Sequence, residues 1–547
     1  MARAPRTSSS PAPGVLASLA RQLVSEWRAG PIHRLTLMGP PPSGLAAWPR
    51  NPRPVSEAAG ERLLRGGFQL AGRTLEVGAG GDPWDRPCPD EAFAVALHGF
   101  GWMGDLLTCG PPGLRDGLRL WRGWRRLFDR PGVFGWSGLA LERRVFNLAC
   151  TVPVLLPLTT DVEAGLFLAD LARQARHLLS DPGDPGRRLE RAIAATLAGV
   201  ALAGPAGEGL IREGLRRLER LAPLAALPDG VHASRSPERG LELLFDLGAL
   251  DDALSQRGAP APPEAARAID RLTGGARFFV LGEHRLARFH GGESGNREAT
   301  ATVLALEAAR VQIMKTAPYG RYQSLEGPRL RVIADAGPPP SGDWGRAACV
   351  QHAALEAAVD GRRLILGSAW SAAAPESAAA LAGPTGGSCL ALADVWPEAG
   401  EVRVERQEAE GGLWIDMVHD GWRPSFGLVH ARRLFVDGVG GELRGEDQLR
   451  VEGVGAARPG QVPFAVRFHL APGVAAEAIE GAAEVRLQPP DAPAWRLKSD
   501  APRLSLEPGV VFEAGEALQT TVVVLAGETT AGQGARVRWK LSPESDG

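Results

Sequence analysis

The stretch Leu413-Trp414-Ile415-Asp416-Met417 places Leu, Ile and Met at every second position, with Trp and Asp between them. Successive side chains of a β-strand point to opposite faces, so this spacing indicates a strand with one face in a core. Runs of the same kind recur through the second half of the chain, at residues 277–280, 330–333, 363–366, 402–405, 466–469, 520–525 and 537–540. Clusters of Gly, Pro and Asp separate them at intervals of roughly 8–15 residues. Many short strands with few helices between them predict an antiparallel β-sandwich.

Before about residue 275 the apolar period is helical instead. Thr160-Asp161-Val162-Glu163 is a capping box, in which the hydroxyl and the carboxylate satisfy each other's exposed amides, and an apolar stripe follows it. Breakers rich in Gly and Pro at residues 181–186, 203–205 and 258–263 separate this helix from similar ones. The tryptophans on these helices are expected in the core rather than at a ligand site. The pattern predicts a series of antiparallel helices.

Size and composition limit the classes of protein. A chain of 547 residues is too long for one core, and we expect a leader at 1–30, a helical domain at 31–275 and a β-sandwich domain at 276–547. The net charge of -2 gives no drive toward nucleic acid. No apolar run of transmembrane length occurs, and the Arg/Ser/Pro-rich start, expected to be disordered, lacks a secretory pattern, so the sequence predicts cytoplasmic residence. Five scattered cysteines without a CxxC pair indicate neither a disulfide framework nor a cysteine-only zinc site.

Side chains with chemical potential gather just after the opening stretch. His419-Asp420-Gly421-Trp422 is followed by His430-Ala431-Arg432-Arg433. Imidazole and carboxylate are ligands of Zn²⁺, and a carboxylate that holds a histidine also tunes a general base. The alternative is that these are strand residues making ordinary hydrogen bonds.

The order of several motifs resembles the heparinase II/III family of polysaccharide lyases, in a bacterial branch, over roughly residues 30–545. The motifs are, in chain order, residues 229–237 (Asp-Gly-Val-His-Ala-Ser-Arg-Ser-Pro), 277–279 with 288–292, 319–322 (Tyr-Gly-Arg-Tyr), 334–337, His352 with Glu356, 419–422, 430–433 and 467–472. The resemblance implies an incomplete α/α toroid of antiparallel helices followed by an antiparallel β-sandwich.

It also implies β-elimination on a uronate-containing polysaccharide. A base removes the C5 proton, another group neutralises the neighbouring carboxylate, and an acid protonates the leaving oxygen. On this resemblance we expect His232, Tyr322 and His290 as catalytic residues. Arg235, Arg321 and Arg432 are the expected ligands of the acidic polysaccharide.

The sequence departs from the family pattern at three places. Pro237-Glu238-Arg239 stands where the family has its helical-domain tyrosine, and 185–188 (Pro-Gly-Arg-Arg) where it has an Asn-His pair. Gly387 stands where a zinc-binding histidine is expected. The alternative function is therefore a catalytically degenerate carbohydrate-binding or envelope-polysaccharide assembly protein, and the family's envelope or periplasmic residence is the alternative localisation.

The resemblance selects Asp420 and His430 as the remaining zinc ligands. Adjacent strand residues point to opposite faces, so only one of His419 and Asp420 can join His430. Cys389 shares the strand parity of Gly387 and is a possible third ligand. Two protein ligands are too few for a structural zinc, so we expect no cofactor, or zinc below one per chain, with Asp420 and His430 in a hydrogen-bonded cluster.

Overall fold

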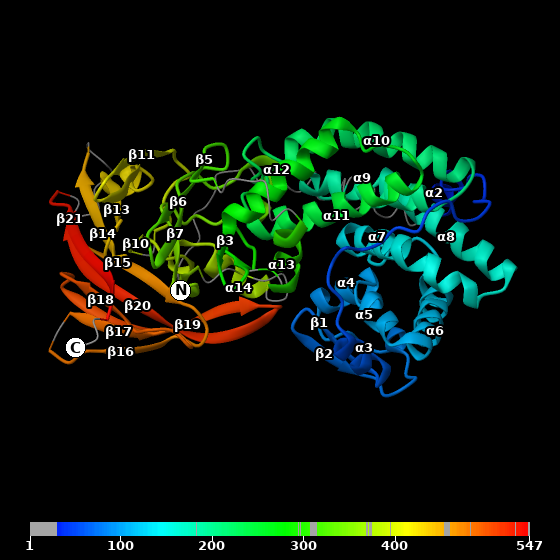
Figure 1. Ribbon diagram of the computed structural model, residues 1–547, viewed down its shortest axis with the longest axis horizontal. Helices are drawn as coiled ribbons and strands as arrows, with labels where there is room; N and C mark the ends of the chain where they lie inside the picture. The colour runs from blue at the N-terminus through cyan, green and yellow to red at the C-terminus, as the bar shows by residue number, and fades with distance from the viewer. Residues whose placement is uncertain are drawn as a thin grey trace. The chain divides into compact units, whose positions relative to one another are not determined.

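The computed structural model describes residues 30–544, apart from 182, 294, 296, 307–313, 368–369, 371–374, 394, 453–459, 482 and 531. The leader expected at 1–30 therefore falls outside the described residues except for Gly30. The chain divides into two compact units. Of the described residues, the helical unit comprises those up to Ala225 and Glu242–Asp270, and the sheet unit comprises Ala226–Leu241 and those from Arg271 onward. In Figure 1 the first runs from blue to green and the second from green to red.

The helical unit is organised around one fully buried helix. Its helices are α2 (Pro31–Thr36), α3 (Glu57–Leu64), α4 (Glu91–Gly99), α5 (Met103–Thr108), α6 (Gly110–Phe128), α7 (Gly138–Leu155), α8 (Asp161–Ser180), α9 (Arg188–Ala201) and α10 (Pro205–Ala225), with most of α11 (Pro237–Gln256) and the start of α12 (Pro263–Phe279). Every residue of α9 from Leu189 to Ala201 is buried, and α7, α8 and α10 pack against it. A helix without a polar face belongs inside a helical layer, so α9 is the centre of this core.

The sequence expectations for these helices are confirmed. Thr160 caps α8 by accepting a hydrogen bond from the amide of Glu163 at 3.3 Å. The other half of the expected capping box differs, because the carboxylate of Glu163 accepts from Arg122. Trp121 and Trp124 on α6 are fully buried, as expected of core tryptophans. A short hairpin, β1 (Gly67–Leu70) with β2 (Arg73–Glu76), interrupts the helices and has no counterpart in the sequence expectations.

The sheet unit is a sandwich of two large antiparallel sheets. One has the strand order β19-β20-β15-β9-β8-β7-β6-β5, with β10 also paired to β15, and the other has the order β11-β12-β13-β14-β21-β18-β17-β16. The strands of the first sheet are β5 (Thr316–Ala317), β6 (Tyr322–Glu326), β7 (Leu330–Asp335), β8 (Leu355–Val359), β9 (Arg362–Leu366), β10 (Leu390–Leu392), β15 (Gln461–Leu470), β19 (Arg503–Glu513) and β20 (Glu516–Thr530). Those of the second are β11 (Val402–Ala409), β12 (Gly412–His419), β13 (Leu428–Asp437), β14 (Leu443–Val451), β16 (Ala475–Ala478), β17 (Glu484–Gln488), β18 (Trp495–Ser499) and β21 (Ala535–Pro543).

The inner faces of the two sheets meet in an aromatic core. Phe468 on β15 and Trp539 on β21 lie with ring centroids 4.8 Å apart, each ring coming from a different sheet. Trp539 also lies flat over Gly445 on β14, where a Cβ atom would stand 2.0 Å from the indole. Glycine is needed at this position because the ring occupies the space that a side chain would fill. Small connecting elements complete the unit, namely β3 (Val280–Gly282), β4 (Arg285–Leu286), α13 (Arg297–Leu306), α14 (Pro375–Leu381) and α15 (Arg423–Phe426).

One expected strand is wrong. Residues 277–279 form the last turn of α12, and only Val280 begins a strand. Leu272, Ala276 and Phe279 are all buried, at spacings of four and three residues that follow the turns of a helix. The run of three apolar residues at 278–280 was too short to distinguish the two periods.

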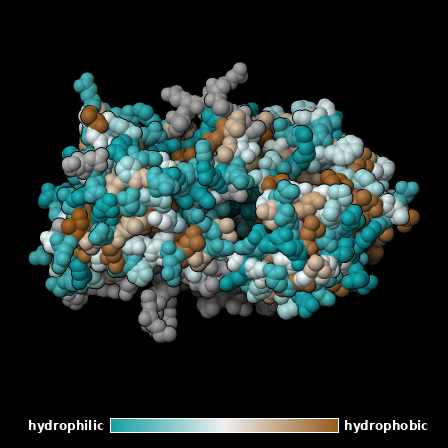
Figure 2. Space-filling view, turned by 60° about the horizontal axis from the view of Figure 1, so that its bottom comes forward, coloured by the Kyte–Doolittle hydropathy of each residue, from teal (hydrophilic) through white to brown (hydrophobic). Residues whose placement is uncertain are grey.

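The face of the molecule seen in Figure 2 is mainly hydrophilic. On the face seen in Figure 2, apolar residues are scattered in small groups among hydrophilic ones. Among the helices of the described part of the chain, none is both long and apolar enough to cross a lipid bilayer.

Candidate functional site

The loop that carries His232 is anchored within the sheet unit by Asp229. One carboxylate oxygen of Asp229 accepts the amides of Tyr319 at 2.6 Å and Gly320 at 2.7 Å, while the other accepts the amide of Val231 at 3.3 Å. Gly230 has a φ of +81°, and a Cβ there would meet the carbonyl oxygen of Arg271 at 1.9 Å. The loop therefore cannot move away from residues 319–320 without losing two hydrogen bonds.

Arg235 ties the same loop to the first sheet. Its buried guanidinium pairs with the carboxylate of Asp335 at the end of β7, and it donates to the carbonyls of Gly320 (2.9 Å) and Pro338. Burial alone would raise the pKa of Asp335, but the charge of Arg235 and the hydrogen bond from His290 hold that pKa below its usual range. Arg235 is thus committed to Asp335 and to backbone carbonyls, so little of it is left for a ligand.

His290 lies on the other side of the same carboxylate. The amide of Cys349 donates to its Nδ1 at 3.2 Å, so the proton of the neutral ring is on Nε2, which donates to Asp335 at 3.0 Å. Burial, the largest cause, lowers the pKa of His290. A neutral ring with both nitrogens in use is a poor proton carrier for an external substrate.

Tyr322 is the third member of this cluster and is fully buried. Its phenol donates to the carbonyl of Arg235 at 2.6 Å, and the guanidinium of Arg235 lies 4.8 Å from the ring centre. Burial raises the pKa of the phenol well above its usual value. The predicted catalytic phenol is thus a buried group bonded to backbone, and its hydroxyl does not reach the surface.

Three residues of the cluster adopt a left-handed backbone that non-glycine residues rarely occupy. The φ angles are 58° at Arg235, 52° at His290 and 60° at Arg321. Strained positions persist where the surrounding contacts over-determine them, and they concentrate at ligand-binding and active sites. Nine other described non-glycine residues share this backbone, so the strain supports a candidate site around Asp335 only together with the contacts given above.

His232 contacts the aromatic ring of Trp344, which the sequence did not predict. The amide of Ser234 donates to its Nδ1 at 3.1 Å, and the indole of Trp344 stands edge-on to the imidazole with centroids 5.2 Å apart. Arg239 lies 5.9 Å from the centre of the Trp344 ring, on the first turn of α11, where the family pattern has its tyrosine. Trp344 sits in a Pro- and Gly-rich segment without periodicity, which offers no sequence signal.

Exposed and half-buried side chains on these loops and on the first turn of α11 make up what we call the Tyr319 surface. It consists of Tyr319, Arg321, Trp344, Arg346 and Arg239. Tyr319 has 62% of its area exposed, Arg321 and Arg346 are exposed, and Trp344 and Arg239 are half-buried. Arginines can pair with carboxylates, and aromatic rings beside them can stack on the faces of sugar rings. Of the predicted site residues, only Arg321 belongs to this surface, while His232 lies beneath it.

The second predicted site forms a buried relay in the second sheet. His419 and His430 are cross-strand partners on β12 and β13. The amide of Gly421 donates to Nδ1 of His419, so Nε2 of His419 donates to Nδ1 of His430 at 3.0 Å. Nε2 of His430 then donates to Asp447 on β14 at 2.9 Å. His352 stacks on the ring of His419 with centroids 4.6 Å apart.

Asp447 is the centre of that relay and was missed from the sequence. It accepts hydrogen bonds from Nε of Arg432 at 2.7 Å and from the indole of Trp539 at 2.9 Å, in addition to His430. Burial would raise its pKa, but Arg432 and His430 hold the pKa far below the usual range. Asp447 stands in the alternating series Leu443, Gly445, Asp447 and Leu449, whose members share one face of the strand. A carboxylate on this otherwise apolar face is the sequence feature that could have predicted it.

Arg432 lies inside the sandwich rather than at a ligand surface. The residue is fully buried, and its Nη1 donates to the carbonyls of Ala353 (2.9 Å) and Ser388 (3.0 Å). Its strand parity is that of the core residue Leu434, whereas Arg433 beside it is exposed. The predicted polysaccharide contact of Arg432 is therefore not available in this arrangement.

The residues present do not fit the family's zinc. Both ring nitrogens of His430 are engaged, by His419 and Asp447, and His419 rather than Asp420 is its cross-strand partner. At Gly387 a Cβ would stand 2.8 Å from the side chain of Gln351, which fills the position of the expected histidine. Among the described residues, no group of three or more His, Cys, Asp or Glu is arranged to hold a metal ion.

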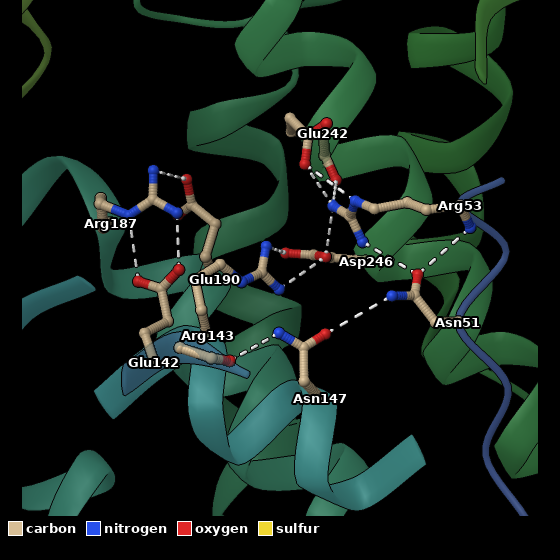
Figure 3. A network of polar contacts seen from close by, with 10 residues as sticks. Asn51, Arg53, Glu142, Arg143, Asn147, Arg187, Glu190, Glu242 and Asp246 are labelled. Carbon is tan, nitrogen blue, oxygen red and sulfur yellow. Dashed lines mark hydrogen bonds and ion pairs between the residues drawn. The ribbon is translucent and has the colours of Figure 1, made fainter. Parts of the chain in front are cut away.

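The helical unit holds a separate network of ion pairs, shown in Figure 3. Arg53 donates to Glu242 (2.5 Å) and Asp246 (2.9 Å) on α11. Arg187, which occupies the region of the expected Asn-His pair, donates to both oxygens of Glu142 on α7 at 2.6 and 3.1 Å. Each of these guanidinium groups already has a carboxylate partner, so the network holds helices together and leaves little charge for a uronate.

We expect the stability of the protein to depend on pH, because it contains buried histidines with a lowered pKa. Burial, the largest cause, lowers the pKa of His98, His352 and His469 to about 4. Histidines of the unfolded chain have a pKa of 6.5 and bind protons below that pH, whereas the buried rings of the folded protein stay neutral. The free energy of unfolding therefore decreases as pH falls from 6.5 to about 4. We expect the unfolding temperature measured by calorimetry to drop by about 5 °C or more between pH 7.5 and 4.5.

Two variants separate this cause from others. His352→Phe keeps the stacking on His419 but removes a titrating group, so it should flatten the pH profile. His284→Gln changes the exposed histidine and should leave the profile as it is. A profile unchanged in His352→Phe would contradict the assignment.

Comparisons with known proteins agree with this architecture. Residues 309–540 match the family described as "Heparinase II/III-like, C-terminal". FtsZ-localized protein C of Caulobacter vibrioides is 42% identical over 552 residues, covering 96% of this chain and 95% of that protein.

Solved structures carry the same fold. The crystal structure of heparinase III superposes with a TM-score of 0.70 at 13% identity, covering 90% of this chain and 85% of the other. That of the heparan sulfate lyase HepC from Pedobacter heparinus gives a TM-score of 0.56 at 16% identity, covering 90% and 84%. The expected toroid followed by a β-sandwich is thereby confirmed as the fold class. With the full-length relative and the matching C-terminal region, this chain belongs to the heparinase II/III-like family.

Proposed function

We propose that this chain binds an acidic, uronate-containing glycan through the Tyr319 surface without cleaving it. The observation that carries the proposal is the position of Tyr322, whose phenol is fully buried and donates to a backbone carbonyl at 2.6 Å. β-Elimination needs a base that reaches the C5 proton of the bound sugar. Within the described part of the chain, which contains all ten histidines, His284 is the one histidine that is not buried.

The binding half of the proposal rests on Arg321 and its setting. Its backbone is held at a φ of 60°, and its carbonyl and that of Gly320 face the guanidinium of Arg235. Held in this way, the Arg321 side chain is presented from a rigid loop, which reduces the entropy lost on binding.

The test measures binding and cleavage on the same sample. An oligogalacturonate of defined length is titrated by calorimetry at low salt, while ultraviolet absorbance follows unsaturated product. We expect binding without product, and Arg321→Glu should weaken binding at this surface about tenfold. Arg403, an exposed arginine on β11 of the second sheet, is not one of the residues of this surface. Arg403→Glu is therefore the matched control and should bind as the unaltered chain does.

The same assay tests a lyase as the second candidate. Tyr319 favours it, because this exposed phenol stands on a loop fixed by Asp229 beside Arg321. Appearance of unsaturated product that Tyr319→Phe abolishes would establish the lyase and refute the non-cleaving proposal. Absence of binding to uronate, sulfated and neutral glycans alike would refute both.

The name of the relative suggests where the protein acts. That protein is described as FtsZ-localized, and we propose that this chain also localises with FtsZ, in envelope-polysaccharide assembly. Cytoplasmic residence stays a prediction, with the envelope or periplasm as its alternative. A fluorescent fusion should coincide with labelled FtsZ, and periplasmic recovery on fractionation or a diffuse signal independent of FtsZ would contradict this placement.

A further inference from the structure

The outer face of the eight-stranded sheet contains a groove of about 930 Å³. It crosses β12, β13, β14, β21 and β18, which are consecutive in the strand order. Trp414 and Phe435 are cross-strand partners in it, with ring centroids 6.1 Å apart and an interplanar angle of 44°. Both rings are half-buried and lie on the face opposite the core residues Ile415 and Leu434.

The charges of the groove are arranged with the cations outermost. Arg433 has 58% of its side chain exposed against 25% for its partner Asp416, and Arg538 has 60% against 44% for Asp500. Lys498 and Lys540 line the same groove, each paired with a better covered glutamate, Glu484 or Glu442. A ligand approaching the groove therefore meets positive charge first, although the whole chain carries a net charge of -2.

We propose that this groove is a second binding surface for an acidic polysaccharide, separate from the Tyr319 surface. Trp414 offers a stacking platform for a sugar ring, next to Phe435, whose ring has the guanidinium of Arg444 5.6 Å from its centre. The surrounding arginines and lysines pair with the carboxylates that repeat along the glycan. A sheet face favours a glycan over an acidic peptide. The strands here are already paired on both sides, so the main-chain hydrogen bonds that an edge strand gives to an extended peptide are missing.

The proposal extends the proposed function but uses different residues, so the two can fail separately. Calorimetric titration with the oligogalacturonate should give two ligands per chain. Trp414→Ala and, independently, Arg433→Glu should each weaken one of the two sites about tenfold, and Arg321→Glu should weaken the other. Trp396→Ala, an exposed tryptophan outside the groove, and Arg403→Glu are the matched controls and should leave both sites intact.

The possible results decide between the surfaces. Two sites separated by these variants support the proposal. A single site lost with Arg321→Glu but unaffected by Trp414→Ala and Arg433→Glu overturns the groove and leaves the Tyr319 surface standing. A single site lost only with the groove variants supports the groove and overturns the Tyr319 surface. Equal competition at the groove by a polyglutamate peptide of the same charge would overturn the assignment to glycan, and no binding at all would overturn both.

Discussion

Asp447→Asn is expected to lower the free energy of unfolding of the sheet unit by about 3–5 kcal/mol, because it leaves the buried charge of Arg432 without a counter-charge. The side chains of Asp447 and Arg432 are both fully inaccessible, and the carboxylate also accepts hydrogen bonds from His430 and Trp539. Asparagine can accept only through one oxygen, so at least one of these donors loses its partner. Chemical denaturation followed by tryptophan fluorescence measures the change.

Asp416→Asn is the control on the same sheet. Its pair with Arg433 joins the same two kinds of group, through two hydrogen bonds instead of one, but it is solvent-exposed, so its loss should cost less than about 1 kcal/mol. Equal effects of the two substitutions would contradict the energetic role assigned to the relay. The stabilisation by Asp447 should be present above the unfolded carboxyl pKa of 3.8 and be lost as pH falls below it, because its pKa is depressed in the folded protein.

Arg235→Met is expected to cost a similar amount, about 3–5 kcal/mol, and to weaken glycan binding as well. Methionine retains apolar volume over the Tyr322 ring but leaves Asp335 as a buried carboxylate with His290 as its remaining side-chain donor. It also removes the donor to the carbonyl of Gly320, next to Arg321. Loss of the fixed backbone at Arg321 should raise the Kd at the Tyr319 surface even where the protein remains folded.

A double substitution distinguishes the charge from the packing. Arg235→Met with Asp335→Leu removes both charges and should recover part of the lost stability, because a buried pair can be replaced by apolar residues at little cost. It should not recover binding, since the carbonyl of Gly320 still lacks its donor. Arg235→Met alone with unchanged stability would contradict the account of the cluster. Arg433→Met on the second sheet is the matched exposed arginine and should change stability by less than about 1 kcal/mol.

Proton chemistry at Asp335 is limited by the same contacts. Nδ1 of His290 accepts a hydrogen bond from the amide of Cys349, and Nε2 donates one to Asp335. The hydroxyl of Tyr322 donates to the backbone carbonyl of Arg235. Each potential acid or base in the cluster therefore has a structural partner that a substrate would have to displace. This supports the proposal that the site binds a glycan without cleaving it. Tyr319 differs from these groups because its side chain is exposed.

The spacing of apolar residues predicted the helical and sheet portions of the chain. Side chains return to the same face every 3.6 residues or so in a helix and every two in a strand, and this repeat is visible in the local sequence. The strand at 413–417 and the cap at Thr160 followed from such patterns and are confirmed. Residues 277–279 were misjudged because three apolar residues fit both repeats, and the packing of α12 decides between them.

The site depended on contacts between distant parts of the chain. Asp335 meets Arg235 from 100 residues away, and Asp447 meets His430 across two neighbouring strands whose register no local pattern sets. Burial then determined which polar groups remain available: Arg432 and Arg433 are adjacent in sequence, yet strand parity places one in the core and the other in a solvent-exposed groove. Parity can be read from sequence once a strand is known, but which face is buried depends on how the two sheets pack.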